Sequence, residues 1–360
     1  MKILQRYIIH EIWLPALLCF LTLNFIFMGG YLVQAANFII GRGVPLTDTL
    51  YVLILALPDM ISYTVPTSLL TAVLIVYGSL SQNNEIRAVK ASGIHPLFIM
   101  TPAFLIGLLV TLAMFVFNDQ IASNASFESR RATKKILIKH PNALIEPGRF
   151  VKISENVTFL AKEMQGDTLR DIVAYETEDG DKPVRTVMAE RGEIYKNPKL
   201  EEIKIRLYDG SISDAEEASV QSIQFKTYEF PTVGQEDLQK MRKKTRELSL
   251  AELLLRLEKA DLSEEDRLEV WSCFHHKIAF SFGSFLFVFL GIPVAILVHR
   301  GETILSFAIS MAVVGVYYVL YVAAKSVALQ GALPPVIAFW IPNLLLFWLG
   351  FYLQRRAYVS

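Results

Sequence analysis

Between residues 97 and 118 the chain reads LFIMTPAFLIGLLVTLAMFVFN, a run without a single charged side chain. A helix rises about 1.5 Å per residue and the hydrocarbon core of a bilayer is about 30 Å thick, so a run of this length predicts a membrane-spanning helix. The stretch that follows, residues 119–139, is rich in charged and polar side chains. We therefore expect a helix that crosses a membrane and continues into water.

Five further stretches are long and apolar enough to do the same. The six predicted spans are Ile12–Ile40, Val52–Leu80, Leu97–Asn118, Phe274–Val298, Leu305–Ala328 and Pro335–Leu353. The first is preceded by Lys2 and Arg6, as in a signal peptide, but it exceeds the roughly 7–15 residues of a signal core. His10 and Glu11 also interrupt its start. We expect it to stay in the protein as a span.

The composition supports this class. Of 360 residues 53% are hydrophobic and 19% are charged, against roughly 25% charged in a soluble domain. The formal net charge is zero, which gives no reason to expect nucleic acid as a partner. The two cysteines, Cys19 and Cys273, do not indicate a disulfide scaffold.

Basic residues in the short loops predict the orientation, because cytoplasmic loops carry an excess of Lys and Arg. On one side lie Lys2, Arg6, Arg87, Lys90, Arg300, Arg355 and Arg356; the other side has Arg42 and an uncharged loop at Gln330–Pro334. Both termini are therefore predicted to be cytoplasmic. The predicted domains are residues 1–118 with three spans, residues 119–273 outside, and residues 274–360 with three more spans.

The outside region changes to the two-residue period of half-buried strands. Ile203, Ile205 and Leu207 alternate with polar or amphipathic neighbours. Turn residues recur at close to the 8–12-residue spacing of a sandwich or barrel, and about eight strands fit. The pattern predicts an all-β, jellyroll-like domain with helical flanks, inserted between the third and fourth spans.

Catalytic motifs are missing from the sequence. There is no G-x-x-x-x-G-K-[ST] loop, so the chain has no P-loop nucleotide site, and there is no G-x-S-x-G, H-E-x-x-H or CxxC. Glu269 with His275 and His276 resembles a set of metal ligands, but adjacent histidines point in different directions on a helix. We predict neither catalytic residues nor a metal site.

A short segment between the second and third spans, Asn83–Pro96, has the pattern of a helix. Four of its residues share one side at three- and four-residue spacing: Glu85, Ala88, Val89 and Ser92. Gly93 can cap such a helix and Pro96 can stop it. The spacing leaves two interpretations open, a helix that docks into a groove of a cytosolic partner or a turn that lies on the membrane surface.

Two ionisable residues lie at membrane depth. Asp59, between Pro58 and Pro66, either faces a bundle interior or cavity, or is an interfacial carboxylate at a bent helix end. Lys325, near the outer end of the fifth span, either anchors the helix by snorkelling or meets an anionic lipid group. The residues alone do not decide between these alternatives.

Motifs spread along nearly the whole chain resemble one family. They are Arg6-Tyr7 with Glu11, the P-x-S-L-L run Pro66–Leu70, the run G-x-L-S-x-x-N-E-I-x-A-x-x-A-S-G at Gly78–Gly93, Leu290-Gly291-Ile292-Pro293, Lys325 followed by Gly331 and Leu333-Pro334-Pro335, and Trp340-Ile341-Pro342-Asn343. In this order, with a β-domain between the third and fourth spans, they resemble the LptF/LptG permeases.

The resemblance implies an assembly in the bacterial inner membrane. Two different permease subunits pair over a dimeric cytosolic ABC ATPase of the LptB type, which holds the ATP and Mg²⁺, so this chain needs no cofactor. Lipopolysaccharide enters their shared cavity from the outer leaflet among the membrane lipids. It leaves through the β-jellyroll to periplasmic jellyroll proteins of the LptC and LptA type and on toward the outer membrane.

The resemblance also assigns roles to residues. It makes Glu85, Ile86, Ala88, Val89, Ser92 and Gly93 the helix that couples to the ATPase, and the lipid-binding candidates are Lys325, Arg42, Gln34, Tyr31 and Asp59. Family members often carry Lys or Arg in the outer half of the first span, whereas Tyr31–Gln34 has none. That departure leaves the cavity charge to Arg42, Lys325 or the partner subunit, and puts an ordinary phosphate-rich cargo in doubt. The β-domain resembles LptF more than LptG.

Other functions remain open at this point. A related ABC permease could export another glycolipid or a lipoprotein, although lipoprotein-releasing permeases have four spans rather than six. A membrane-bound periplasmic enzyme would need converging polar residues in the β-domain, where the histidines, His140, His275 and possibly His276, lie only at the margins. A scaffold without transport activity is the third alternative. Co-purification of an ATPase would separate all three from the exporter.

Overall fold

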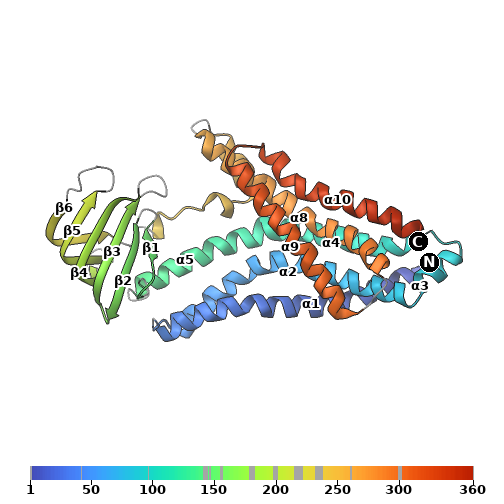
Figure 1. Cartoon of the computed structure of the whole chain (residues 1–360), viewed down its shortest axis with the longest axis horizontal. Coiled ribbons are helices and arrows are strands. Elements are labelled where there is room, and N and C mark those ends of the chain that lie inside the picture. The colour runs from blue at the N-terminus through green and yellow to red at the C-terminus, as the bar shows by residue number, and fades with distance from the viewer. Residues whose placement is uncertain are drawn as a thin grey trace. The chain divides into compact units, whose positions relative to one another are not determined.

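A computed structural model describes residues 2–41, 43–95, 97–140, 145, 147–154, 157–177, 183–197, 202–214, 222–231, 238–259, 262–298 and 302–359. The chain forms two compact units (Figure 1). The helical unit comprises Met1–Gly30, Ala56–Phe127 and Lys243–Ser360, and the sheet unit comprises Tyr31–Leu55 and Glu128–Arg242. This division by packing differs from the boundaries predicted at residues 118 and 273, which concern the sides of the membrane and stay a prediction.

The described residues include six helices long and apolar enough to cross a membrane, which confirms the predicted number. They are α1 (Lys2–Ala36) with the π-helical turn η1 (Asn37–Gly41), α2 (Leu46–Gln82), α4 (Leu97–Val116) with η2 (Phe117–Ala122) and α5 (Ser123–Lys139), α8 (Glu264–Val298), α9 (Thr303–Leu329) and α10 (Pro335–Val359). Shorter elements are α3 (Glu85–Ala91), η4 (Thr245–Glu247) and α7 (Leu250–Leu257).

Helices α2 and α8 form the centre of the helical unit. Their most apolar windows are 78% and 67% buried, whereas those of α1 and α9 are only 6% and 22% buried. Gly291 of α8 permits the close packing, because a Cβ there would lie 2.8 Å from Cδ1 of Leu70 on α2. The apolar faces of α1 and α9 are therefore left for lipid or for a partner.

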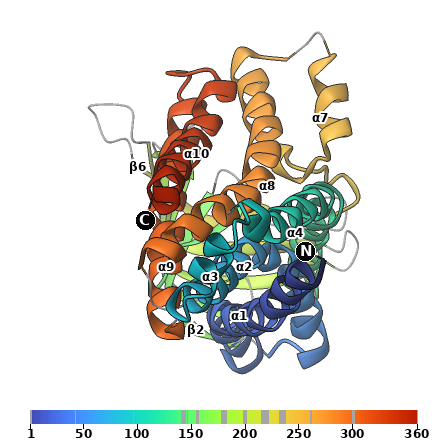
Figure 2. The same cartoon turned by 90° about the vertical axis from the view of Figure 1, so that its right-hand side faces the viewer.

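The two ends of the helical unit differ. Both termini and α3 lie at one end, which we call the inner end (Figure 2). The other end, which we call the outer end, carries η2, η4, α7 and the start of α8. The Nζ atom of Lys90 on α3 donates a hydrogen bond to the carbonyl of Ala357 on α10 over 3.1 Å, which joins α3 to the last helix at the inner end.

The sheet unit contains six antiparallel strands in one sheet, ordered consecutively from β1 to β6. They are β1 (Val151–Ser154), β2 (Val157–Gln165), β3 (Thr168–Thr177), β4 (Pro183–Asn197), β5 (Glu202–Asp214) and β6 (Ser222–Pro231). The β-domain is confirmed. The expected number of about eight strands is wrong for the described residues, which form six. These strands lie in the sheet in chain order, as a meander, which differs from the crossing connections of a jelly roll. Alternation along a strand says which face is buried but not which strand is its neighbour.

A line of unpaired residues crosses five of these strands. Five residues have no bridge partner, although the residues on either side of each one pair with the neighbouring strand. They are Lys162, Asp171, Glu190, Asp209 and Lys226. Each strand changes its in–out alternation there: β4, for example, buries residues 187 and 189 before the line and 192 and 194 after it. The pairing register is the same on both sides of the line, so the strands change their alternation together and none carries an extra residue over its neighbour. Both halves can therefore turn side chains toward one apolar core, as the two sheets of a jelly roll do.

The second part of the sheet unit is helical. The end of α1, the start of α2 and the second half of α5 meet around Val44 and Ile136, which are 2% and 5% exposed. Phe38, Val52 and Leu137 surround this pair. The cluster fixes the first turn of α2 against α5 and so forms one wall of the pocket described below.

Candidate functional site

Four of the six predicted coupling residues lie on α3, which is a helix as expected, and Ser92 and Gly93 follow its end. It ends in a Schellman motif: the amide of Gly93 donates to the carbonyl of Lys90, and the amide of Ile94 donates to the carbonyl of Val89. Gly93 has a φ of 79°, a left-handed conformation that glycine adopts without steric cost. The predicted cap is confirmed, whereas Pro96 lies outside the described residues.

The two sides of α3 have different surroundings. Ile86 is 5% exposed and belongs to the core of the helical unit, and Val89 packs against that core. Ala88 and Ser92 are exposed, and Glu85 is half-buried. The predicted face is thus split. Its Val89 side holds α3 to the spans, and its Ala88 and Ser92 side is open at the inner end.

Lys325 is exposed on α9, one helical turn beyond the buried Tyr321. The hydroxyl of Tyr321 donates to the carbonyl of His276 on α8 over 3.0 Å and lies 2.9 Å from Nδ1 of the same residue. About 22 residues separate Lys325 from the inner start of α9, so it lies about 33 Å along the helix. The contact with His276 therefore fixes the turn of α9 that carries Lys325, about one bilayer thickness from the inner end of this helix.

Asp59 is half-buried on α2, at a polar patch of the helical unit. Ser126 Oγ lies 2.9 Å from each of its carboxylate oxygens. Nearby on the same helices, Ser62 Oγ donates to Oδ1 of Asn118 over 2.7 Å. Asp59 therefore contacts α5 at this end of the helical unit.

An ion pair that the sequence analysis did not single out lies at the same end. Nζ of Lys277 on α8 is 3.4 Å from Oδ1 of Asp119 in η2, and their side chains are 7% and 11% exposed. The same carboxylate oxygen accepts a hydrogen bond from the amide of Leu250, the first residue of α7, over 2.6 Å. Lys277 interrupts an apolar run, and an ionisable residue within a span is a signal that could have found this pair.

The remaining lipid-binding candidates belong to the sheet unit. Tyr31 is half-buried and Gln34 is exposed on the last turns of α1. Arg42 lies outside the described residues. Lys325 and Asp59 belong to the helical unit instead.

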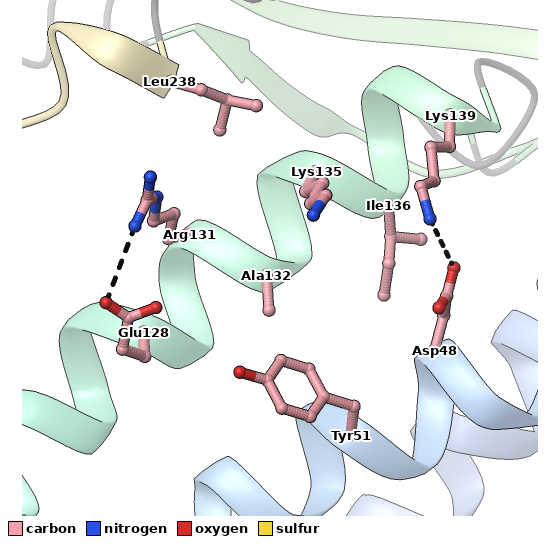
Figure 3. Close-up of a pocket in the computed structure, with 9 residues that line it drawn as sticks. All are labelled: Asp48, Tyr51, Glu128, Arg131, Ala132, Lys135, Ile136, Lys139 and Leu238. Carbon is pink, nitrogen blue, oxygen red and sulfur yellow. Dashed lines mark hydrogen bonds and ion pairs between the residues drawn. The ribbon is translucent and has the colours of Figure 1, made fainter.

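The sheet unit also holds a pocket of about 330 Å³ between α2 and α5 (Figure 3). Asp48 and Tyr51 come from α2, the largest share comes from one face of α5, and Leu238 closes one side; the α5 residues are Glu128, Arg131, Ala132, Lys135, Ile136 and Lys139. Lys139 Nζ lies 3.4 Å from a carboxylate oxygen of Asp48. Arg131 lies 3.8 Å from Glu128.

The pocket combines cations with an apolar floor. Ala132 and Ile136 are buried at its base, and Lys135 is exposed above them. Among the described residues that line the pocket, Lys135 is the cation without an acidic partner. Arg131, Lys135 and Lys139 follow a spacing of four residues, which places them on one side of a helix. That spacing is a signal present in the sequence, where these residues otherwise read as a charged continuation of the third span.

The family described as "Lipopolysaccharide export system permease LptF/LptG" matches residues 6–356. The chain belongs to the LptF/LptG family. The match covers the six spans and the β-domain alike and does not separate LptF from LptG. Membership makes the chain a multi-pass membrane protein of a family of permeases, which are transport components of the bacterial inner membrane.

A relative of unknown function also matches part of the chain. It is the "Uncharacterized protein RP871" of Rickettsia prowazekii (strain Madrid E), 22% identical over 147 residues. The match covers 41% of this chain and 41% of the length of the relative. The relative carries no activity in its description, so the family match alone gives the class.

Proposed function

We propose that this chain is a permease subunit of an ABC transporter that extracts lipopolysaccharide from the inner membrane. In this proposal it pairs with a second permease subunit of the same family over a dimeric cytosolic ATPase, which binds the ATP and Mg²⁺. The central β-domain passes the lipid to periplasmic jellyroll proteins that lead to the outer membrane. Both termini are then cytoplasmic.

The observation that carries the proposal is the arrangement of α3. Ile86, Val89 and Lys90 attach it to the spans, while Ala88 and Ser92 remain open. A helix held in this way can pass a displacement of an attached partner to the bundle, because its inward side chains are close-packed. Glu85, half-buried at its first turn, supplies a carboxylate for a basic group of the ATPase, and Gly93 ends the helix.

The open helices support pairing with a second permease. The outward face of α1 exposes large apolar residues, among them Trp13, Leu14, Leu18, Leu21 and Phe25. On α9, Val316, Val319 and Val322 are each more than 60% exposed. Apolar surface of this kind is suited to lipid or to another apolar helix. A cavity shared by two subunits can form between such faces.

Two basic sites suit an anionic lipid head group. Lys325 lies at the outer boundary of its span, where acidic groups of a lipid lie. In the sheet unit, Lys135 and Arg131 stand over an apolar floor in a pocket whose volume is within the range of ligand sites. We propose that each contacts phosphate or acidic sugar groups of the cargo at a different stage of transport, with Arg42, Gln34, Tyr31 and Asp59 as further candidates.

Co-purification tests the assembly. The tagged chain, expressed in its own host and extracted in mild detergent, should bring an ABC ATPase, a second permease and lipopolysaccharide, identified by mass spectrometry. Substitution Ala88→Trp at the open side of α3 should remove the ATPase from the complex, whereas Thr303→Trp, at an exposed residue of the inner end of α9, should not. A chain that purifies with another glycolipid, a lipoprotein or no ATPase would overturn the proposal.

Charge reversal tests the cargo sites. Lys325→Glu should impair lipopolysaccharide release far more than Lys325→Gln, because it replaces attraction by repulsion. For the pocket, Lys135→Glu should reduce photo-crosslinking of lipopolysaccharide, whereas Lys134→Glu, at the neighbouring residue that does not line the pocket, should leave it unchanged. Equal tolerance of all four substitutions would remove both sites from the proposal.

Labelling in intact spheroplasts tests the orientation. A cysteine at Ser211 in β5 should react with an impermeant maleimide, and a cysteine at Ser92, which is exposed after α3, should be protected until the membrane is permeabilised. The native Cys19 and Cys273 are replaced by serine in both variants. Equal labelling of the two positions would contradict the proposed topology.

A further inference from the structure

The segment just before α7 is strongly basic. The run KMRKKTR, Lys240–Arg246, places five cations within seven residues. It leads into η4 and α7, which belong to the helical unit from Lys243 onward. None of these residues entered the candidate sites above.

Several hydrogen bonds hold η4 and α7 to the outer end of the spans. Asp119 accepts a bond from the amide of Leu250 over 2.6 Å. Nζ of Lys243 donates to Asn124 Oδ1 and to Glu252 Oε1, each over 3.0 Å. Glu252 also closes a capping box with Ser249 at the start of α7. The segment is therefore part of the bundle.

These contacts place α7 at a definite level. Lys277, which shares Asp119 with the amide of Leu250, is separated by about 21 residues, or about 31 Å, from Val298 at the inner end of α8. Asp119 lies about 33 Å along the third span from Leu97. Both distances match the roughly 30 Å thickness of the hydrocarbon core. The first turn of α7 thus lies at the outer boundary of the bilayer.

The outward side of α7 is apolar. Leu253 is fully buried against the bundle, whereas Leu254 and Leu255 are 46% and 63% exposed. About six residues farther out than Lys277, Trp271 is 38% exposed, and an exposed Trp at the end of a span is typical of the membrane–water interface. Two leucines at this level suit the boundary between head groups and acyl chains.

The charges beside these leucines indicate the kind of lipid. Lys244 and Arg246 are exposed at η4, directly before the apolar side of α7. Basic residues next to an interfacial apolar helix attract anionic lipids. A protein partner fits less well, because two exposed leucines fall far short of the roughly 800 Å² per partner that a stable interface buries.

We infer that η4 and α7 form an interfacial anchor, in which Leu254 and Leu255 enter the outer leaflet and Arg246 with Lys244 contacts anionic phospholipid head groups. The anchor fixes the outer ends of η2 and α8 to the membrane surface. The inference rests on the membrane spans and not on the cargo proposed above, so the two can fail separately.

Lipid quenching tests the depth. The variant Leu255→Cys, in a background with Cys19 and Cys273 replaced by serine, is labelled with bimane and placed in nanodiscs of phosphatidylcholine and phosphatidylglycerol. Lipid carrying a doxyl group at carbon 5 should quench this label at least about two-fold more than a label at Arg267→Cys. The control residue is exposed in the first turn of α8, about 15 Å farther out than Lys277. Quenching of the Leu255→Cys label by aqueous iodide alone, or by neither agent, would overturn the anchor.

A second measurement, on the same labelled Leu255→Cys variant, tests the charge preference before any charge is changed. In the wild-type charge background, doxyl-labelled phosphatidylglycerol should quench the label at residue 255 more than doxyl-labelled phosphatidylcholine does. Arg246→Gln should lower this preference by about two- to five-fold, the effect of one cation near an anionic surface, while Arg267→Gln should not. Equal quenching by both lipids before any charge is removed would refute the basic part of the anchor.

Discussion

Removal of the lysine from the ion pair at the outer end should destabilise the protein strongly. In Lys277→Met the carboxylate of Asp119 loses its cation while its side chain, 11% exposed, stays inside the protein. Loss of one partner of a buried pair costs about 3–5 kcal/mol. Asp119 keeps two hydrogen bonds, from the amide of Leu250 and from Nε2 of Gln120, so we expect the lower end, about 3 kcal/mol.

The double variant separates the charge from the packing. Asp119→Asn keeps a side-chain oxygen that can accept the bond from the amide of Leu250, and combined with Lys277→Met it removes both charges at once. An uncharged pair of similar volume leaves no unpaired charge in the protein. We expect the double variant to recover at least about 2 kcal/mol relative to Lys277→Met alone, so that the coupling energy of the cycle equals this recovery plus the cost of Asp119→Asn alone.

Reversible unfolding in mixed micelles of dodecyl maltoside and sodium dodecyl sulfate, followed by circular dichroism, gives these free energies. The single variant Asp119→Asn completes the cycle, because it leaves Lys277 unpaired and should also destabilise. Additive effects of the two substitutions would contradict a coupled buried pair. Losses below about 1 kcal/mol for each would show that the pair is exposed to water in the bilayer.

Three other changes have expected outcomes. Gly283→Ala brings a Cβ to 2.8 Å from a buried tyrosine hydroxyl of α9 and should cost about 1–3 kcal/mol in the same unfolding assay, whereas Gly315→Ala, with nothing within 4 Å, should cost nothing; equal effects would contradict the packing of α9. Asp209→Gly relieves a left-handed φ of 51°, which costs an L-residue about 1–2 kcal/mol, against about 0.5–1 kcal/mol of added chain entropy; the sheet should gain about 0.5–1 kcal/mol, seen as slower hydrogen exchange in β5, and faster exchange would argue against strain there. The hydrogen bond from Arg206 lowers the pKa of Glu229. The stabilisation from this contact is therefore full above the unfolded pKa of about 4.3 and is lost as the pH falls through the lowered pKa. Hydrogen exchange in β6 should rise below about pH 4 in the wild type but not in Glu229→Gln, and the same pH profile in both would refute this role.

Several features of the fold follow from local sequence. The six spans could be predicted because the thickness of the bilayer sets the length of an apolar run, whatever the helix packs against. Helix α3 and its end at Gly93 could be predicted because a Schellman motif depends on residues within two turns. The two-residue period from Ile203 to Leu207 likewise revealed a strand, since the period depends only on burial of one face.

The arrangement of the sheet was less accessible. The expected strand number is wrong for the described residues, and the strand order could not be predicted, because pairing joins segments that alternation does not relate to one another. The line through Asp171 and Asp209 shifts the alternation by one residue in each strand, which makes one bent strand look like two short ones in a sequence. That shift contributed to an expected number of about eight strands.

The candidate site shows the same division. Lys325 and Glu85 attracted attention in the sequence because a charge in a span and a carboxylate in a small-residue helix are local signals. The partners of Asp119 could not be found in this way: Lys277 is 158 positions away and the amide of Leu250 is 131 positions away. The free energy of a buried charge depends on what surrounds it in space.

The sequence by itself determined that this protein has six spans, a β-domain between the third and fourth, and a short helix between the second and third. Hydrophobic length, the period of a strand and a helix cap are local quantities, and the chain carries them whatever its tertiary structure. Only the tertiary structure decided which side of α3 is open, which cation of α5 stands over the pocket floor, and that Asp119 joins α7 to α8. Each of those depends on burial and distance between segments far apart in the chain, which exist only once the helices and strands have packed.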